Sequence, residues 1–174
     1  LNALVAKKLR ARLGGELQYI FLGGAALAPH LLKIFTGVGL IFVHGYGLTE
    51  TSPLTHGNPI RGERRVGSIG VPVPGTDARI VDLATAQPLP AGGEGELEVR
   101  GPQVMLGYWN RPAETAEMFH DGWLRTGDIC RMDADGFFYI ADRLKRMINA
   151  SGYKVWPAEL EATLYKHPDI KEVA

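Results

Sequence analysis

The stretch that decides the fold is Leu40-Ile41-Phe42-Val43-His44-Gly45-Tyr46-Gly47-Leu48-Thr49-Glu50-Thr51. It opens with an apolar run as long as a buried strand, and the run leads into a glycine-rich turn. Upstream, residues 17–22 indicate a second buried strand that ends at Gly23-Gly24, and residues 29–35 indicate a helix. Strand, loop, helix and strand in this order predict a parallel α/β layer with loops at the strand ends.

The turn after the second strand has side chains that suit a nucleotide site. Tyr46 lies between two glycines, so its ring offers a face on which a base could stack. Thr49 and Thr51 offer hydroxyls to phosphate oxygens, and Glu50 offers the hard oxygen ligand that Mg²⁺ prefers. A capped loop explains the same residues, with Thr49 as the N-cap and Glu50 in a first helical turn. From these residues alone both interpretations stay open.

The earlier turn, Gly23-Gly24-Ala25-Ala26-Leu27, is less specific. Its small residues would let the backbone approach a flat ligand closely. Taken alone, the turn favours an ordinary connection between a strand and a helix, because glycine is the usual residue of tight turns.

The rest of the chain extends this layer on both sides. Leucine and valine residues recur at helical spacing over residues 1–13 and predict a helix that ends at Gly14-Gly15. After about residue 60, alternating segments at residues 78–82, 96–100 and 137–141 predict antiparallel strands, with a short helix near residues 112–119. Pro157 suits the first position of a helix over residues 158–167. We therefore expect three parts, at residues 1–60, 61–144 and 145–174.

Composition narrows the class of protein. The formal net charge is +0 and 45% of residues are hydrophobic, as in a globular protein without the basic excess of a nucleic-acid binder. Cys130 is the single cysteine, so no internal disulfide can form, and a cytoplasmic location fits. No apolar run approaches the roughly 20 residues that span a membrane. The sequence leaves peripheral membrane association and the oligomeric state open.

Residues 45–51 resemble the Y-G-x-T-E motif of the adenylate-forming superfamily. That superfamily contains acyl-CoA synthetases, luciferases and adenylation domains that load carrier proteins. The resemblance implies that Tyr46 stacks on adenine and that Thr49 contacts the α-phosphate of ATP. It also implies that Glu50 helps to hold Mg²⁺.

The same resemblance assigns the neighbouring residues. The turn at residues 23–27 matches the small-residue turn that precedes the motif in the family, at a comparable distance. This match implies that Gly24 and Ala25 lie near the adenine ring. His44 and Gly45 match positions beside the acyl pocket, where the carboxylic acid substrate would bind.

Later motifs follow in the order of the same family. Residues 123–128 resemble its T-G-D element, which implies that Asp128 binds both ribose hydroxyls; a carboxylate can accept two such hydrogen bonds. Residues 142–148 resemble its hinge, which implies that Arg143 contacts the ribose and that Lys145 is the pivot of a lid. We expect Gly152, just after the hinge, to border the tunnel for the pantetheine arm of CoA. Residues 101–109 resemble a stretch typical of bacterial fatty acyl-CoA ligases, and we assign no chemistry to them.

Each later motif has a plainer explanation when it is taken alone. Thr-Gly-Asp is common in turns, and a charged run such as residues 142–148 is common in solvated surface strands. A glycine before an aromatic residue, as at residues 152–153, also suits a tight turn before a helix. Five elements in family order favour the resemblance over coincidence.

The resemblance covers essentially the whole chain and implies its fold. We expect the C-terminal part of a large N-terminal domain, made of an α/β and a β-rich subdomain, and the start of an α+β lid. The chain begins without methionine and ends in what resembles a starting strand, so we expect an internal piece of a longer enzyme. The family's phosphate-gripping loop, which ends in Pro-Lys, and its catalytic lysine late in the lid have no counterpart here. We expect the 174 residues to be inactive alone.

The implied activity is that of an ATP-dependent acyl-CoA ligase. The carboxylate of the acid attacks the α-phosphate of ATP to give an acyl-adenylate and pyrophosphate, and the thiol of CoA then displaces AMP. ATP, Mg²⁺ and CoA are thus the expected cofactors. A fatty acid is the expected acid, and aryl or short branched acids are alternatives.

Rival functions share most of these motifs. One is an adenylation domain that loads a carrier protein, but such domains usually have a G-R-x-D-x-Q-V-K-I-R-G hinge, which differs from residues 142–148. Another is a luciferase-like oxygenase. A third is a relative that binds ATP without reacting it.

Overall fold

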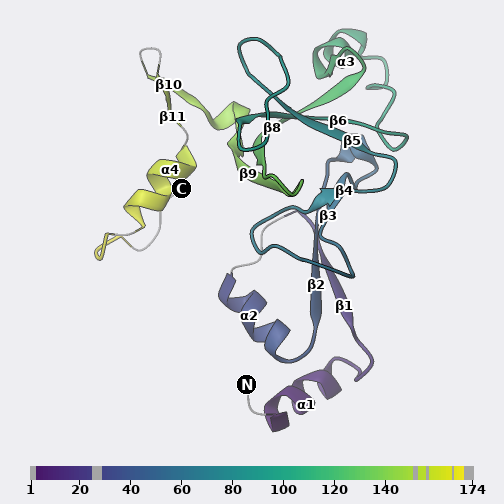
Figure 1. The fold of residues 1–174 in the computed structure, drawn as a ribbon, viewed down its shortest axis with the longest axis vertical. Helices are drawn as coiled ribbons and strands as arrows, with labels where there is room; N and C mark the ends of the chain where they lie inside the picture. The colour runs from purple at the N-terminus through teal and green to yellow at the C-terminus, as the bar shows by residue number, and fades with distance from the viewer. Residues whose placement is uncertain (1–2, 25–28, 151–152, 156, 166, 171–174) are drawn as a thin grey trace. The chain divides into compact units, whose positions relative to one another are not determined.

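The computed structural model describes residues 3–24, 29–150, 153–155, 157–165 and 167–170. The chain forms two compact units, whose elements are labelled in Figure 1. The first unit contains residues 1–76 and 101–106. The second unit contains residues 77–100 and 107–174.

The first unit contains the predicted α/β layer. Its elements are α1 (Ala3–Arg12), β1 (Tyr19–Leu22), α2 (Pro29–Gly37) and β2 (Ile41–Tyr46). Strands β1 and β2 pair in parallel, with Leu22 opposite His44. Val38, Leu40 and Val43 are buried, as the apolar run at residues 40–43 predicts. The parallel layer is confirmed, but the buried strand predicted at residues 17–22 is wrong: β1 begins at Tyr19, and the side chains of Tyr19 and Phe21 are exposed.

Two short strands extend this sheet after the glycine-rich turn. A single 3₁₀ turn, η1 (Thr49–Thr51), is followed by β3 (His56–Gly57) and β4 (Val71–Pro72). The strand order is β1-β2-β3-β4, and β3 runs antiparallel to both β2 and β4. Because Tyr46 pairs with His56, the chain that leaves the turn packs against the strand that enters it.

The second unit is an antiparallel sheet, as the alternating segments predict. Its strands are β5 (Asp77–Val81), β6 (Glu94–Arg100), β7 (Phe119–His120), β8 (Trp123–Met132) and β9 (Phe138–Arg143). The order is β5-β6-β8-β7, with β9 also paired to β8. Helix α3 (Pro112–Met118) precedes β7. Leu97, Val99, Leu124, Ile129 and Phe138 form the buried core of this sheet.

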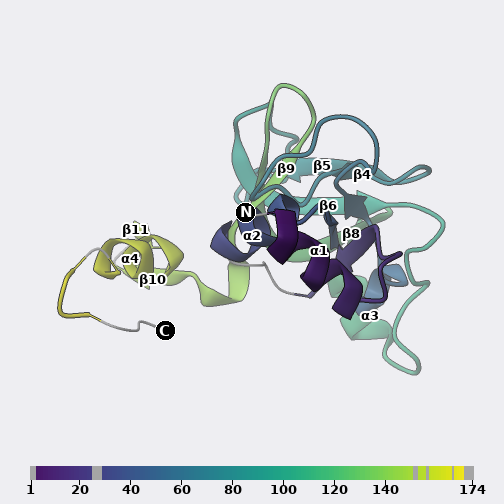
Figure 2. The ribbon, with the colours of Figure 1, turned by 90° about the horizontal axis from the view of Figure 1, so that it is seen from below.

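The same unit ends in a hairpin and a helix. The 3₁₀ turn η2 (Leu144–Arg146) leads into β10 (Ile148–Ala150) and β11 (Tyr153–Val155), which pair antiparallel, and α4 (Pro157–Leu164) follows (Figures 1 and 2). The predicted helix begins at Pro157, which is confirmed, but α4 ends earlier than residue 167. The strand predicted at residues 171–174 lies outside the described residues. None of the helices described here has the length and apolar character needed to cross a membrane.

Candidate functional site

The described start of the first glycine-rich turn lies close to the second turn, where β1 and β2 end. Since β1 and β2 run parallel and in register, their carboxyl ends meet at one edge of the first sheet. A Cβ atom built on Gly23 would lie 4.0 Å from the carbonyl oxygen of Gly45. Gly24 has a φ of +81°, a conformation that glycine adopts without strain. Ala25 lies outside the described residues, so its predicted place near adenine stays a prediction.

The turn at residues 44–51, which we call the glycine turn, is closed by a very near approach of two backbone segments. A Cβ atom built on Gly47 would lie 1.7 Å from the carbonyl oxygen of Pro53 and 2.7 Å from its carbonyl carbon. Only glycine fits there without a shift of the backbone. The requirement for Gly47 therefore comes from chain packing, whatever the turn binds.

The 3₁₀ turn η1 forms the end of the glycine turn. Two expectations about its threonine residues are wrong. Its N-cap residue is Leu48, and Thr49 is the first residue of the turn, so the predicted Thr49 N-cap is wrong. Thr51 is fully buried, and its hydroxyl accepts a hydrogen bond from the Leu48 N–H at 2.9 Å. That hydroxyl is buried and hydrogen-bonded within the turn, so it is not available to a phosphate. Thr49 is exposed and Glu50 is half-buried, so both side chains can reach a ligand.

Tyr46 is held at its backbone and at its ring. The N–H of Thr55 donates to the carbonyl oxygen of Tyr46 at 2.8 Å. The ring of His56 packs edge-on against the Tyr46 ring, with centroids 5.8 Å apart and planes at 63°. His56 is fully buried, and burial lowers the pKa of its imidazole to about 3. A neutral histidine therefore braces one side of the tyrosine.

His44 and Gly45 precede Tyr46 on β2. His44 is half-buried, and burial lowers the pKa of its imidazole. Its carbonyl oxygen accepts a hydrogen bond from the N–H of Asn58 at 2.9 Å. A Cβ atom built on Gly45 would lie 2.8 Å from Cδ1 of Leu54, so the Leu54 side chain packs over this glycine.

Residues 101–106, to which the sequence assigns no chemistry, brace the glycine turn. The N–H of Met105 donates to the carbonyl oxygen of Glu50 at 2.8 Å. The side-chain amide of Gln103 donates to the hydroxyl of Thr76 at 2.5 Å and to the carbonyl oxygen of Leu54 at 3.2 Å. The segment therefore fixes the chain at the predicted metal ligand and just after the turn.

The second candidate region lies in the second unit, where β8 meets β9. Asp128 is 3% exposed and pairs across the two strands with Arg143. The Arg143 Nε atom lies 3.1 Å from Oδ1 of Asp128, and the Arg143 side chain is 69% exposed. We call Thr126, Gly127, Asp128 and Arg143 the charged corner.

The T-G-D element lies in a strand. The turn that Thr-Gly-Asp suggests when taken alone is therefore wrong. All three residues lie within β8. The hydroxyl of Thr126 donates to the carbonyl oxygen of Leu97 at 2.8 Å and accepts from the N–H of Asp128 at 3.1 Å. Gly127 has a φ of +71°, which favours glycine. Threonine and glycine together shape an irregular strand that presents the aspartate.

The predicted hinge follows β9. Lys145 is exposed and lies in the 3₁₀ turn η2. Its neighbour Arg146 forms an ion pair with Glu161 of α4 and lies 3.9 Å from Oδ1 of Asp142. Asp142 is 5% exposed, so the solvated strand considered for this run is wrong at that residue. Gly152 lies outside the described residues.

A protein-only metal site is not formed by the described residues. Within them, no group of three or more histidine, cysteine, aspartate or glutamate side chains lies together in a way that could hold a metal ion. Mg²⁺ commonly takes one or two carboxylates together with water and phosphate oxygens. Glu50 therefore fits the ion only as a single ligand beside a bound phosphate.

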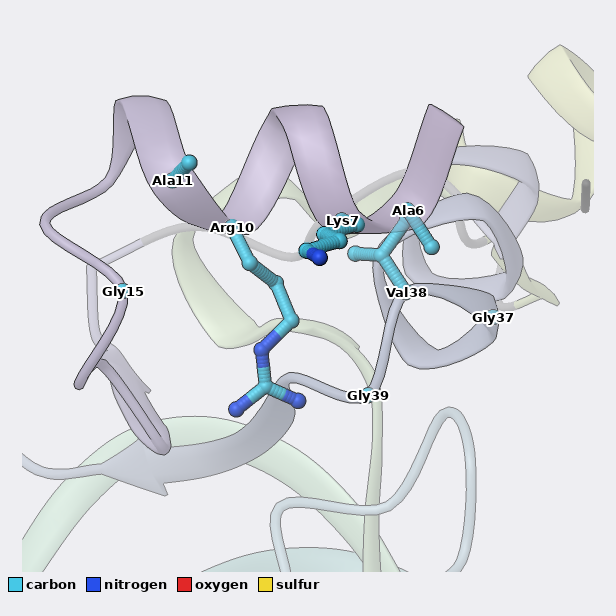
Figure 3. A pocket seen from close by; sticks show the side chains of 8 residues that line it. All are labelled: Ala6, Lys7, Arg10, Ala11, Gly15, Gly37, Val38 and Gly39. Atoms are coloured by element: carbon cyan, nitrogen blue, oxygen red, sulfur yellow. The ribbon is translucent and has the colours of Figure 1, made fainter. Parts of the chain in front are cut away.

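Two pockets lie away from these residues. One, of about 540 Å³, lies between α1 and the chain after α2, and Arg10 points from α1 toward Gly39 (Figure 3). The other, of about 380 Å³, is lined in part by Glu96, Glu98 and Arg125. None of the predicted site residues lines either pocket.

Sequence reasoning missed the residues that hold the site residues in place. His56 and Gln103 are examples, and both act through contacts distant in sequence: Gln103 lies 49 positions from Leu54. Spacing within a motif carries no signal of such a contact. The resemblance of residues 101–109 to a family stretch was the one signal that could have directed attention to Gln103.

Comparisons with known proteins agree on one family. Residues 1–109 match the family model described as AMP-binding enzyme. The chain is 51% identical over 152 residues to the long-chain-fatty-acid–CoA ligase of Bacillus subtilis (strain 168), a match that covers 87% of this chain and 27% of the ligase. It is 41% identical over 160 residues to the feruloyl-CoA synthase of an Amycolatopsis species, covering 91% of this chain and 32% of the synthase.

Solved structures give the same result for the fold. The crystal structure of ATP-bound MatB from Rhodopseudomonas palustris superposes with a TM-score of 0.77 and 35% identity. The superposition covers 85% of this chain and 30% of MatB. The chain thus spans about a third or less of each of these relatives.

Proposed function

Because the chain belongs to the family of AMP-binding enzymes, we propose that it forms the adenosine-binding part of an ATP-dependent acyl-CoA ligase. The observation that carries this proposal is the charged corner. There a nearly buried carboxylate lies 3.1 Å from an exposed guanidinium, on an irregular strand held in place by a threonine hydroxyl. An ionised carboxylate can accept hydrogen bonds from two adjacent hydroxyls. Asp128 is therefore assigned to the ribose, with Arg143 beside it.

The glycine turn is assigned to the base and the α-phosphate. Tyr46, braced by His56, would offer its ring face to adenine, next to Gly24 and Ala25. Thr49 would donate its hydroxyl to the α-phosphate, and Glu50 would be a ligand to Mg²⁺. Bound Mg²⁺ would offset the negative charge that crowds around the reacting phosphates. The contribution of the chain itself is to place these groups in a fixed geometry.

The reaction that we assign has two halves. An acid carboxylate attacks the α-phosphate of ATP and releases pyrophosphate, and the thiol of CoA then displaces AMP from the acyl group. Lys145 would be the hinge about which the lid turns between the two half-reactions. It lies in η2, between β9 and the hairpin that leads to α4. We place the pantetheine arm of CoA near Gly152.

A fatty acid is the substrate that we propose. The Bacillus subtilis relative is named for a long-chain fatty acid and is 51% identical to this chain, whereas the feruloyl relative is 41% identical. His44 and Gly45 would lie beside the acyl pocket. We further propose a cytoplasmic location, as for an enzyme that uses soluble ATP and CoA.

The test is ATP-dependent release of pyrophosphate by the complete enzyme. Carboxylic acids of increasing chain length, together with ferulate, are supplied with and without CoA. Release with fatty acids and formation of a CoA thioester are expected. Release without any thioester would favour carrier loading, and silence with every acid would favour a relative that only binds ATP. We expect no release from the isolated 174 residues, because they lack the phosphate-gripping loop and the late lysine.

A further inference from the structure

The position of Asp128 depends on an irregular stretch of β8. Glu96 pairs with Ile129 and Glu98 pairs with Arg125, so residues 126–128 lie opposite the single residue Leu97. Extra residues in one strand bend it and can redirect a side chain. The direction of the Asp128 carboxylate is therefore set by whatever holds this bulge.

Glu96 holds the bulge by its centre. Its Oε1 atom accepts a hydrogen bond from the N–H of Gly127 at 3.1 Å. Its Oε2 atom accepts from the Nη2 and Nε atoms of Arg125, at 2.8 and 3.2 Å. Gly127 directly precedes Asp128 and has a φ of +71°. Because glycine lacks a Cβ atom, its backbone could adopt other conformations if this contact were lost. A buried charge thus fixes the one residue of the bulge that is least restricted by its own side chain.

A second buried carboxylate on the same strand shows what an ordinary structural pair looks like here. Glu98 is 1% exposed and forms an ion pair with Arg79 at 2.6 Å. It also lies 3.3 Å from Nδ1 of His120. The side chain of Glu98 contacts β5 and β7 and not the bulge, whereas the side chain of Glu96 contacts the bulge itself. The two glutamates are matched in burial and in pairing and differ in what they hold.

We infer that Glu96 is a positioning residue for ribose recognition, acting through the backbone of Gly127 on the carboxylate of Asp128. The inference rests on the proposed role of Asp128. An ion pair with a buried carboxylate is not in itself strong support for stability, because apolar residues of similar volume often serve as well. The hydrogen bond to Gly127 gives this pair a separate task.

The experiment compares Glu96→Gln with Glu98→Gln in the complete enzyme. Both changes keep the size of the side chain and remove its charge. Because one of the two polar atoms of a glutamine is a donor, residue 96 can then no longer accept from both Gly127 and Arg125. The readout is the ratio of kcat/KM for ATP to that for 2′-deoxy-ATP, measured by pyrophosphate release. The wild-type enzyme is expected to prefer ATP by about tenfold or more, as for loss of one hydrogen bond to a charged group. Glu96→Gln is expected to lower this preference several-fold and to raise KM for ATP more than it lowers kcat.

Glu98→Gln is expected to leave the preference for ATP unchanged, even if it lowers the melting temperature. Should Glu96→Gln fail to fold, the double variant Glu96→Leu with Arg125→Leu removes both charges, and the same loss of preference is expected from it. An unchanged preference in a folded Glu96 variant, while Asp128→Ala abolishes the preference, would overturn the inference alone. An unchanged preference in Asp128→Ala would overturn the proposed role of Asp128, and the inference with it.

Discussion

The glycine turn and the charged corner are built in different ways. The glycine turn is held by contacts of backbone and neutral groups, such as the Thr55 N–H on Tyr46 and the Met105 N–H on Glu50. The charged corner is held by ion pairs in which a buried carboxylate meets a partly exposed arginine, with Asp128 against Arg143 and Glu96 against Arg125. The difference teaches where each region is sensitive: the turn to any change of backbone space, and the corner to removal of a charge.

Among the substitutions that test this comparison, Gly47→Ala in the glycine turn should have a large effect. The added methyl group would overlap the Pro53 carbonyl, so the turn must shift. We expect a loss of about 1–3 kcal/mol in the free energy of unfolding. A displacement of about 1 Å in the site would lower the rate of adenylation about 100-fold. Thermal unfolding and pyrophosphate release measure the two effects.

Gly23→Ala is the matched control, because its added methyl would meet no atom of the described residues nearer than 4.0 Å. It should leave the free energy of unfolding nearly unchanged and the rate of adenylation within a few-fold of wild type. Equal damage from both substitutions would mean that the turn is not limited by the approach of Pro53.

A smaller effect is expected at the hinge that follows the charged corner. Proline at residue 145 fixes φ, so Lys145→Pro should slow thioester formation about tenfold more than adenylation. Lys145→Ala removes the same side chain and leaves φ free, so the two rates should keep their ratio. Single-turnover assays of each half-reaction measure both. If Lys145→Pro slows the two steps equally, residue 145 is not a pivot.

The brace on the glycine turn should give a still smaller effect. Gln103→Leu keeps the side-chain volume and removes the amide that donates to Leu54 and Thr76. Loss of hydrogen bonds of this kind costs about 1 kcal/mol each. If about half of this cost of two bonds is felt at the ATP site, KM for ATP rises roughly fivefold. Gln87→Leu, in an exposed loop of the other unit, is the control. A KM equal to that of wild type in Gln103→Leu would show that the Gln103 amide has no role in the site.

How much of these two regions the sequence predicts depends on how far apart the interacting residues lie along the chain. The apolar run at residues 40–43 and the glycines after it predict β2 and its turn, because both signals are local. Thr126 cannot be interpreted in the same way, since its hydroxyl donates to Leu97, which lies 29 positions away. The alternation of Glu96, Leu97, Glu98 and Val99 indicates a strand with one polar face. The alternation does not reveal that the side chains of Glu96 and Glu98 are buried and form ion pairs.

Burial of His56 predicts an effect of another kind, on the pH dependence of stability. The pKa of His56 is about 3 in the folded chain and 6.5 in its ordinary state. Below pH 6.5 the unfolded chain therefore takes up a proton that the folded chain does not. Stability that is fully present above pH 6.5 should fall as the pH drops toward 3, by at most about 1.4 kcal/mol per pH unit.

Denaturant unfolding at several pH values tests this, with His56→Gln as the variant that cannot take up the proton. The slope of stability against pH should be shallower in His56→Gln than in wild type between pH 6.5 and 4. His167→Gln, which removes a histidine that is exposed in the folded chain, is the control. Identical slopes in all three proteins would show that His56 is protonated as readily in the folded chain as in the unfolded one.

The most direct test of the account is the dependence of pyrophosphate release on ATP concentration in Asp128→Ala. Asp121→Asn, which changes an exposed carboxylate of the same unit, is the control. Two hydrogen bonds to a charged group contribute about 3–6 kcal/mol together, so the account predicts a rise in KM for ATP of at least about 100-fold in Asp128→Ala. The control should keep the wild-type value. A KM within a few-fold of wild type in Asp128→Ala, with the protein folded, would contradict the assignment of the charged corner to the ribose.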